Sequence, residues 1–253
     1  MTSFTCQRDL ILNLVRRNFV VGFKGSTLGI LWSALLPLFQ LLVLVFVFRG
    51  IIPLGIDDYP EFVLAGLLPW NWFSTSINSA GNTFLTNKDL MSRPDFAPYM
   101  LIVIDALTNL LTFLISLPIL FGLLALGGRG ITVGLLFFPF LVLIEGILIV
   151  GLGLLIATLN VFYRDVAYIV NALIMLVFWL TPVFYQSTIV PKEYRFIFLW
   201  NPMAVLVENY RAIFFGTPLD WNSLLLSFVM SVIVCGLGYL AYYRKASDII
   251  DAI

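Results

Sequence analysis

Six stretches of this 253-residue chain are apolar over a length that meets or approaches what a helix needs to cross a lipid bilayer. A spanning helix requires about 20 mostly apolar residues. Only 11% of the residues are charged, whereas soluble domains carry about 25%. The sequence therefore predicts an all-α, polytopic membrane protein of one domain (1–253) with six transmembrane helices. The predicted spans are Ile30–Phe48, Phe62–Phe84, Met100–Leu126, Ile131–Leu159, Val166–Phe184 and Leu224–Tyr243.

Several kinds of chemistry are excluded by what the chain lacks. It has no histidine, which removes imidazole acid–base catalysis and His-ligated metals. Its two cysteines, Cys6 and Cys235, fall before the first span and inside the last, so we expect neither a disulfide nor a zinc site. The phosphate-binding pattern G-x-x-x-x-G-K-[ST] does not occur. We therefore expect that this chain is not an enzyme and that it binds no metal and no cofactor. Net charge is formally zero, and no nucleic-acid partner is expected.

Lysine and arginine placement predicts the orientation. The predicted side that carries both termini and the tail 244–253 has nine of these cations, and the other side has five. The richer side is taken as cytoplasmic. Its cations are Arg8, Arg16, Arg17, Lys24, Lys88, Arg93, Arg164, Arg244 and Lys245, against Arg49, Arg129, Lys192, Arg195 and Arg211.

Residues 1–29 are predicted to form an amphipathic interface segment ahead of spans one to five (30–184). Leu10, Ile11, Leu14 and Val15 share one arc of a helical wheel, and polar residues such as Arg16 occupy the opposite arc. We expect this helix to lie on the inner leaflet. Packing against the protein's own cytoplasmic loops is the alternative.

The segment 185–223, between span five and span six (224–243), is long for a loop and is not polar. It contains two apolar runs, Phe196–Trp200 and Ala204–Phe215, separated by Asn201-Pro202. Apolar runs this short are typical of re-entrant or interfacial segments. We expect two short re-entrant helices on the outer side, which form either an outer gate or an interfacial cap.

Polar residues inside the predicted spans are the main departures from apolarity. Asp105 and Glu145 lie in spans three and four. Such carboxylates either have a structural role in the packing of helices or subunits, or bind the ion in an ion-coupled carrier. The second span carries a polar stripe, which we expect at a subunit interface or along a pore. Its residues are Asn71, Ser74, Ser76, Asn78, Ser79 and Asn82.

Four motifs occur in order along the chain. They are Lys24–Trp32 followed by Pro37, Leu159–Val166, Thr181–Val183, and Asn201-Pro202 with Tyr210-Arg211 shortly after it. In this order, on six spans, the chain resembles the permease subunit of type-two ABC exporters over nearly its whole length. The most similar branch exports polysaccharides such as O-antigen, capsule or teichoic acid.

The resemblance implies a channel-forming subunit that moves a lipid-linked polysaccharide across the bacterial inner membrane. Two copies would work with two ATPase subunits, which bind the ATP and Mg. An exporter of a drug or small lipid is the alternative within the family. The loop Thr86–Arg93 would contact the ATPase through Lys88, Asp89 and Arg93, and Arg164 with Asp165 would cap a helix and transmit motion, or simply anchor the topology. The outer gate would include Asn201, Pro202, Glu208, Tyr210 and Arg211.

Aromatic side chains are the candidates for contact with the glycan, because a ring can stack on the C–H face of a sugar. Trp and Tyr also gather at membrane interfaces whatever the cargo, so an aromatic belt is the alternative. The candidates are Trp32, Trp70, Trp72, Phe73, Trp179, Phe184 and Tyr185.

Overall fold

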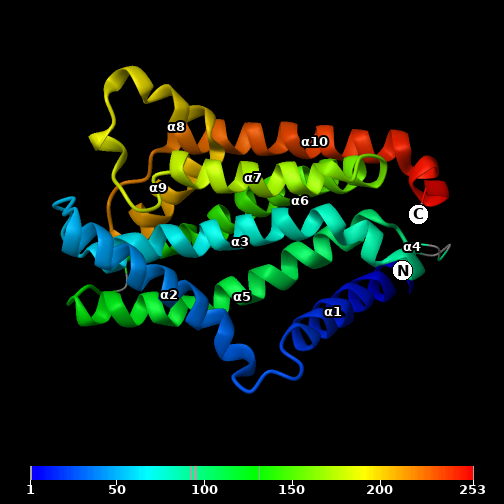
Figure 1. The fold of residues 1–253 in the computed structure, drawn as a ribbon, viewed down its shortest axis with the longest axis horizontal. Coiled ribbons are helices and arrows are strands. Elements are labelled where there is room, and N and C mark those ends of the chain that lie inside the picture. Colours follow the sequence, from blue (N-terminus) through cyan, green and yellow to red (C-terminus); the bar gives the residue numbers. More distant parts are fainter. Residues whose placement is uncertain (1, 92, 94–95, 131, 253) are drawn as a thin grey trace.

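The structure, a computed structural model, describes residues 2–91, 93, 96–130 and 132–252. The side chains at 2–7, 250 and 251 are not described, so the expectation for Cys6 lies outside the described residues, as does the first residue of the predicted fourth span. In the described part every regular element is helical, as predicted. Both termini and α4 lie at one end of the bundle, called here the α4 end, and α8 lies at the other, the α8 end (Figure 1).

Among the described residues the α-helices are α1 (Thr2–Gly22), α2 (Trp32–Val45), α3 (Tyr59–Thr86), α5 (Tyr99–Leu126), α6 (Phe138–Phe162), α7 (Asp165–Leu180), α9 (Pro202–Phe215) and α10 (Trp221–Ala252). Two much shorter ones are α4 (Lys88–Met91) and α8 (Phe196–Trp200). Helical turns extend α2 at both ends as η1 (Gly29–Leu31) and η2 (Phe46–Ile51), and η3 (Val133–Phe137) precedes α6. Two more, η4 (Ser187–Ile189) and η5 (Lys192–Tyr194), lie in the segment before α8.

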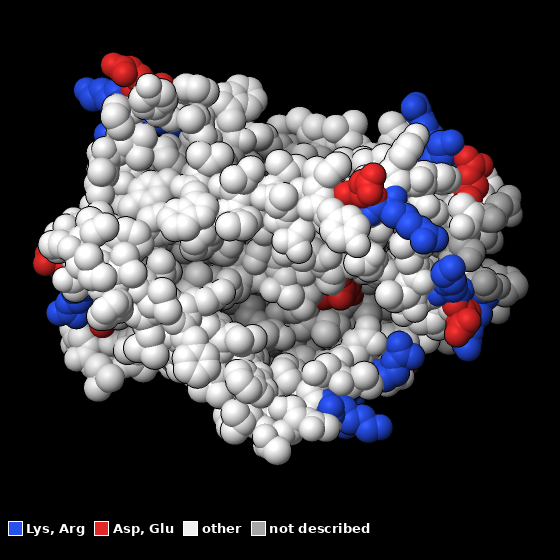
Figure 2. Space-filling model, viewed as in Figure 1, with Lys and Arg blue, Asp and Glu red and all other residues white. Residues whose placement is uncertain are grey.

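Among the described residues, four helical segments are both long and apolar enough to cross a membrane: Gly29–Ile51, Tyr99–Leu126, Val133–Phe162 and Trp221–Ile249. On the face shown in Figure 2, charged side chains gather toward the two ends of the molecule, and the middle is uncharged apart from an acidic group in a hollow near the centre. The other two predicted spans also form helices. Of these, α3 is a continuous helix, but its polar stripe interrupts the apolar run. The 16 residues of α7 reach only about 24 Å, less than the ~30 Å of bilayer hydrocarbon.

The fifth predicted span ends earlier than expected. Its apolar run continues through Phe184, but α7 stops at Leu180. Pro182 has no backbone N–H and restricts the residue before it to extended conformations, so the helix cannot continue through Thr181. Thr181 is indeed extended, with φ −97° and ψ 131°.

α3 occupies the centre of the bundle and packs against α2, α5, α6, α7 and α9. A second apolar cluster lies at the α4 end, where Leu14 and Val15 of α1 are buried against α5 residues such as Met100 and Ile104. Half of the apolar arc of α1 therefore packs on the protein itself, against the predicted span α5 rather than only against cytoplasmic loops. Leu10, in the same arc, is exposed. Apolar side chains outside that arc, among them Val20 and Val21, remain exposed.

α6 and α10 pack most closely at two glycines. A Cβ added to Gly151 would lie 2.5 Å from the Cα of Cys235, and one added to Gly238 would lie 2.1 Å from the carbonyl oxygen of Gly151. Small residues allow helix backbones to approach in this way in membranes. This contact fixes the two helices against each other on the side of the bundle that includes Cys235.

The two short helices expected before the last span are present as α8 and α9. They separate at Asn201, whose side-chain oxygen accepts hydrogen bonds from the backbone N–H groups of Met203 (3.1 Å) and Ala204 (3.4 Å). An Asn N-cap followed by Pro202 in the first turn starts a helix efficiently. α8 is largely exposed, whereas most of α9 is buried against α3, α6 and α10. α9 is thus an integral part of the core.

Candidate functional site

Four of the six residues of the predicted polar stripe of α3 lie along an open groove bounded by α2 and α7, whereas Ser76 is buried and Ser79 contacts Asp105 of α5. Two adjoining hollows of about 650 Å³ and about 450 Å³ form it, and both are lined by Asn78 and Asn171. Asn71, Ser74, Asn78 and Asn82 lie three or four residues apart, so the helical repeat brings them to one face of α3. We call these two hollows together the long groove.

The lining of the long groove changes along its length. Toward the α8 end it holds Gln40 of α2 and the aromatic side chains of Trp70 and Phe178, whose ring centroids are 5.6 Å apart. Toward the α4 end it holds two cationic side chains, Lys88 and Arg164. No Asp or Glu is among the described residues that line either hollow.

The five predicted coupling residues all lie at or near the α4 end and are exposed. Lys88 and Asp89 belong to α4, and Arg93 follows it. Arg164 lies in the turn between α6 and α7, and Asp165 is the first residue of α7. Of the five, the structure brings Lys88 and Arg164 to one shared hollow.

The turn between α6 and α7 is fixed by Asn160, which the sequence analysis did not single out. Arg164 is the N-cap residue of α7, and its side chain makes no capping hydrogen bond. Instead Asn160 Oδ1 accepts from the backbone N–H of Ala167 (3.0 Å), while its Nδ2 donates to the carbonyl of Gly81 (2.7 Å). One buried amide therefore ties α3, α6 and α7 together.

Two of the seven candidate aromatic residues line cavities, and they face different sides of α3. Trp70 lines the long groove. Trp72 faces α5, where its indole Nε1 donates to the carbonyl of Ala106 (3.0 Å) and its ring stacks on Phe113. Phe73 is buried beside Trp70.

The other four aromatic candidates lie outside both hollows. Trp32 and Trp179 are exposed on α2 and α7. Phe184 is buried and stacks on Phe48 with ring centroids 5.0 Å apart. Tyr185 donates from its hydroxyl to the carbonyl of Trp179 (3.1 Å), and partial burial raises the pKa of its phenol, which keeps it a neutral donor.

The unwound segment that follows α7 is held from both sides by side-chain hydrogen bonds. Arg211 of α9 donates to the carbonyl of Val183 (2.5 Å) and to that of Phe62 (3.1 Å). Asn201 Nδ2 donates to the hydroxyl of Thr181 (3.0 Å). From α3, the Tyr59 hydroxyl donates to the carbonyl of Phe184 (3.0 Å). Two of the predicted gate residues, Asn201 and Arg211, thus fasten the end of α7.

The remaining gate residues lie elsewhere on the same short segment. Pro202 opens α9. Tyr210 is fully buried in the core beside Glu145. Glu208 lines a separate hollow of about 400 Å³ at the α8 end, together with Arg195 and Asp220.

The two carboxylates inside the predicted spans do not share a cavity among the described residues. Asp105 accepts a hydrogen bond from the Ser79 hydroxyl between α5 and α3. Glu145 is completely buried between α6 and α9.

Comparison with known proteins identifies the family. The sequence profile described as "ABC-2 type transporter" matches residues 9–215. The chain belongs to the ABC-2 type transporter family. This ABC-2 permease is a multi-pass membrane protein and a transport subunit, and the ATPase is a separate polypeptide.

Three relatives of the ABC-2 permease cover most of its length. It is 37% identical to the O-antigen export system permease protein RfbA of Myxococcus xanthus over 82% of this chain and 81% of the relative. It is 27% identical to an RfbA permease of Klebsiella pneumoniae over 94% and 92%. It is 26% identical to the polysialic acid transport protein KpsM of Escherichia coli over 98% and 97%.

Proposed function

We propose that this ABC-2 permease forms the transmembrane conduit of an exporter for a lipid-linked polysaccharide such as O-antigen, in the bacterial inner membrane. A separate ATPase binds the ATP and Mg and supplies the energy, and this chain needs no cofactor of its own. The names of the relatives favour a polysaccharide over a drug or a small lipid. No feature of the described structure favours an ion-coupled carrier.

The long groove is the observation that carries the proposal. Its amide and hydroxyl side chains can donate to and accept from sugar hydroxyls. The half-buried Phe178, backed by the buried Trp70, offers an apolar face for a sugar ring. Polar side chains at membrane depth are costly unless they face protein or a water-filled path. A groove that is polar, uncharged over most of its length and partly aromatic suits a hydrated glycan.

The proposed topology has six crossings, with α3 and α7 as the two that apolarity alone does not identify. Both termini lie at the α4 end, as an even number of crossings requires (Figure 1). The excess of Lys and Arg on that side makes it cytoplasmic. α8 and α9 then form the re-entrant segment on the outer side. Lys88, Asp89 and Arg93 would contact the ATPase, and Arg164 and Asp165 would pass on its motion.

We also propose that two copies of the permease, with two ATPase subunits, enclose the path. α7 is apolar, yet no residue of it is buried in the single chain. The long groove is open along this same helix. A second copy placed against α7 would cover its apolar face and close the groove.

The groove is tested by filling it. Asn78→Trp and Asn171→Trp place a large ring in the wall of both hollows, so export of a labelled polysaccharide from cells should fall strongly while assembly with the ATPase persists. Asn222→Trp on the exposed start of α10 is the matched control. Normal export by both groove variants would contradict a conduit at this surface.

The contact with the ATPase is tested by the double variant Lys88→Ala and Asp89→Ala. We expect copurification of the ATPase or its stimulation by the permease to drop, and export to drop with it. Export that persists with normal ATPase binding would exclude α4 as the coupling element.

A further inference from the structure

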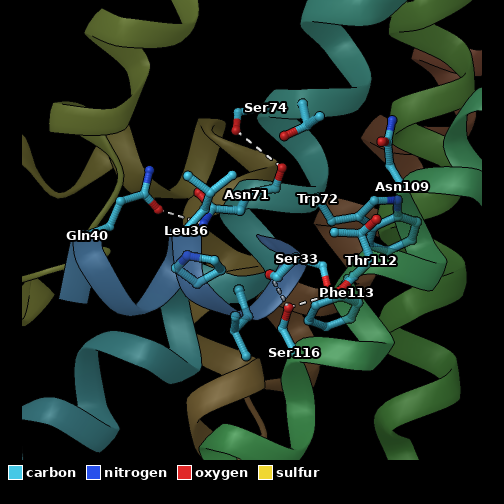
Figure 3. A pocket seen from close by; sticks show the side chains of 13 residues that line it. Ser33, Leu36, Gln40, Asn71, Trp72, Ser74, Asn109, Thr112, Phe113 and Ser116 are labelled. Atoms are coloured by element: carbon cyan, nitrogen blue, oxygen red, sulfur yellow. Dashed lines mark hydrogen bonds between the residues drawn. The ribbon is translucent and has the colours of Figure 1, made fainter. Parts of the chain in front are cut away.

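A separate cavity of about 240 Å³ lies between α2, α3 and α5, beside the long groove (Figure 3). Gln40, Asn71 and Ser74 line both, so the cavity adjoins the groove from the side. We call it the side cavity. Its volume equals that of roughly eight water molecules at about 30 Å³ each, which admits one sugar ring and excludes a folded chain.

The side cavity has polar walls on opposite sides. Figure 3 shows Gln40 and Asn71 on one side, and Asn109 and Thr112 on the other. The second pair comes from a polar stripe of α5, in which Asp105, Asn109 and Thr112 follow at intervals of four and three residues. No charged residue lines the cavity among the described residues. Asp105, one turn away, instead accepts from Ser79.

Some of these polar groups already have partners, and others are available. Asn71 Nδ2 donates to Gln40 Oε1 (2.7 Å). The side-chain amide hydrogens of Gln40 and the side-chain Oδ1 of Asn71 can therefore still form hydrogen bonds. Asn109 Nδ2 is buried and meets no hydrogen-bond partner among the described atoms. A buried donor without a partner is unfavourable, so a ligand that satisfies it gains affinity.

An aromatic pair completes the wall. Trp72 and Phe113 stack with centroids 5.7 Å apart and planes inclined by 7°. The Trp72 indole N–H is engaged by the Ala106 carbonyl, which holds the ring in place. Both rings are buried, at 4% and 3% exposure, so the side cavity combines a small, rigid aromatic wall with neutral donors and acceptors. These are the groups that match the apolar faces and the hydroxyls of an uncharged sugar.

We propose that the side cavity is a subsite for one uncharged monosaccharide unit of the passing glycan. This inference rests on the proposed function, because the sugar reaches the cavity from the long groove. A carboxylated sugar is disfavoured there, since its charge would lose hydration without gaining a cation. The subsite binds weakly enough for release, as transport requires.

The test uses thiol protection in the complete permease–ATPase complex in nanodiscs. Cys6→Ser and Cys235→Ser remove the native thiols. Thr75→Cys then reports on the side cavity, and Asn171→Cys, in a second protein, reports on the long groove. The rate of modification by a small neutral maleimide is measured with maltohexaose, with an oligogalacturonate of the same length, and with neither.

We expect maltohexaose to slow modification several-fold at both positions, and the oligogalacturonate to leave the Thr75→Cys rate unchanged. Protection of Asn171→Cys without protection of Thr75→Cys would show that the side cavity holds water only, which overturns the subsite and leaves the conduit standing. Protection at neither position would overturn both. Equal protection of Thr75→Cys by the two oligosaccharides would overturn the selection for uncharged sugars.

Two variants in the Thr75→Cys protein identify the contacts. Asn109→Leu and Thr112→Val remove polar groups with little change of volume, and each should raise the maltohexaose concentration for half-protection several-fold. Thr108→Val is the matched control on the same helix, because its hydroxyl is engaged by the carbonyl of Ile104 (2.7 Å) and lies outside the cavity. An equal effect of all three variants would indicate a general loosening of α5 and would overturn the assigned contacts.

Discussion

Arg211 and Val183 are joined by a 2.5 Å hydrogen bond from a buried guanidinium to a backbone carbonyl. The same guanidinium donates to the carbonyl of Phe62 and lies 3.6 Å from the centre of that residue's ring. One side chain of α9 thus holds the unwound end of α7 against the first turn of α3. If α9 moves during transport, the end of α7 moves with it, or these bonds break.

Arg211→Lys should lower the free energy of unfolding by about 1–3 kcal/mol, because an ammonium group cannot reproduce the planar fork and leaves a buried carbonyl unpaired. Thermal unfolding of the complex in nanodiscs measures the loss. Arg195→Lys is the control, since Arg195 also donates to two carbonyls, both at 3.3 Å, but is exposed. Equal losses in the two variants would rule out burial as the cause.

The glycine contact between α6 and α10 gives a second prediction. Gly238→Ala places a methyl group 2.1 Å from the carbonyl oxygen of Gly151, so the helices must separate, and we expect a loss of about 1–3 kcal/mol or more. The measurement is resistance to denaturant in detergent micelles. Gly236→Ala on the same helix meets open space and should be neutral. A neutral Gly238→Ala would mean that the two helices are not in close contact.

Hydrophobic patterning predicted most of the fold. Each of the six apolar stretches forms a helix, and Asn201-Pro202 separates α8 from α9 as expected. Apolarity alone did not predict where α7 ends, because Pro182 stops the helix while the apolar run continues to Phe184. Nor did it predict that α1 would pack on α5, since an amphipathic helix has the same pattern against lipid and against protein.

The candidate site was predictable only in part. The polar stripe of α3 was visible in the sequence, and four of its six residues line a groove, but Ser76 and Ser79 do not. The stripe of α5 through Asn109 and Thr112 has the same spacing and was open to the same reasoning. The role of Asn160 was not, because its two partners lie 79 and 7 residues away and only the folded chain brings them together.

Asn160→Asp tests that three-helix contact. The carboxylate keeps the acceptor for the Ala167 N–H but replaces the donor to Gly81 with an oxygen that repels the carbonyl. We expect α7 to loosen, with a loss of about 2–4 kcal/mol, since a buried charge and an unpaired carbonyl are both created. Hydrogen exchange over α7 reports the change locally. Asn222→Asp on the exposed start of α10 should leave exchange over α7 unaltered, and similar exchange in both variants would refute the contact.

The proposed pairing of two permeases predicts a cross-link at the middle of α7. Ile169 and Leu176 lie two turns apart on its exposed face, at 56% and 60% exposure. Leu176→Cys, in a chain with Cys6→Ser and Cys235→Ser, should form a disulfide-linked dimer in membranes on mild oxidation. Leu237 is similarly exposed on α10, at 56%, but does not line the long groove, so Leu237→Cys should stay monomeric. Cross-linking of both variants would indicate random collision. Cross-linking of Leu237→Cys alone would move the interface to α10, and α7 would then be exposed to lipid.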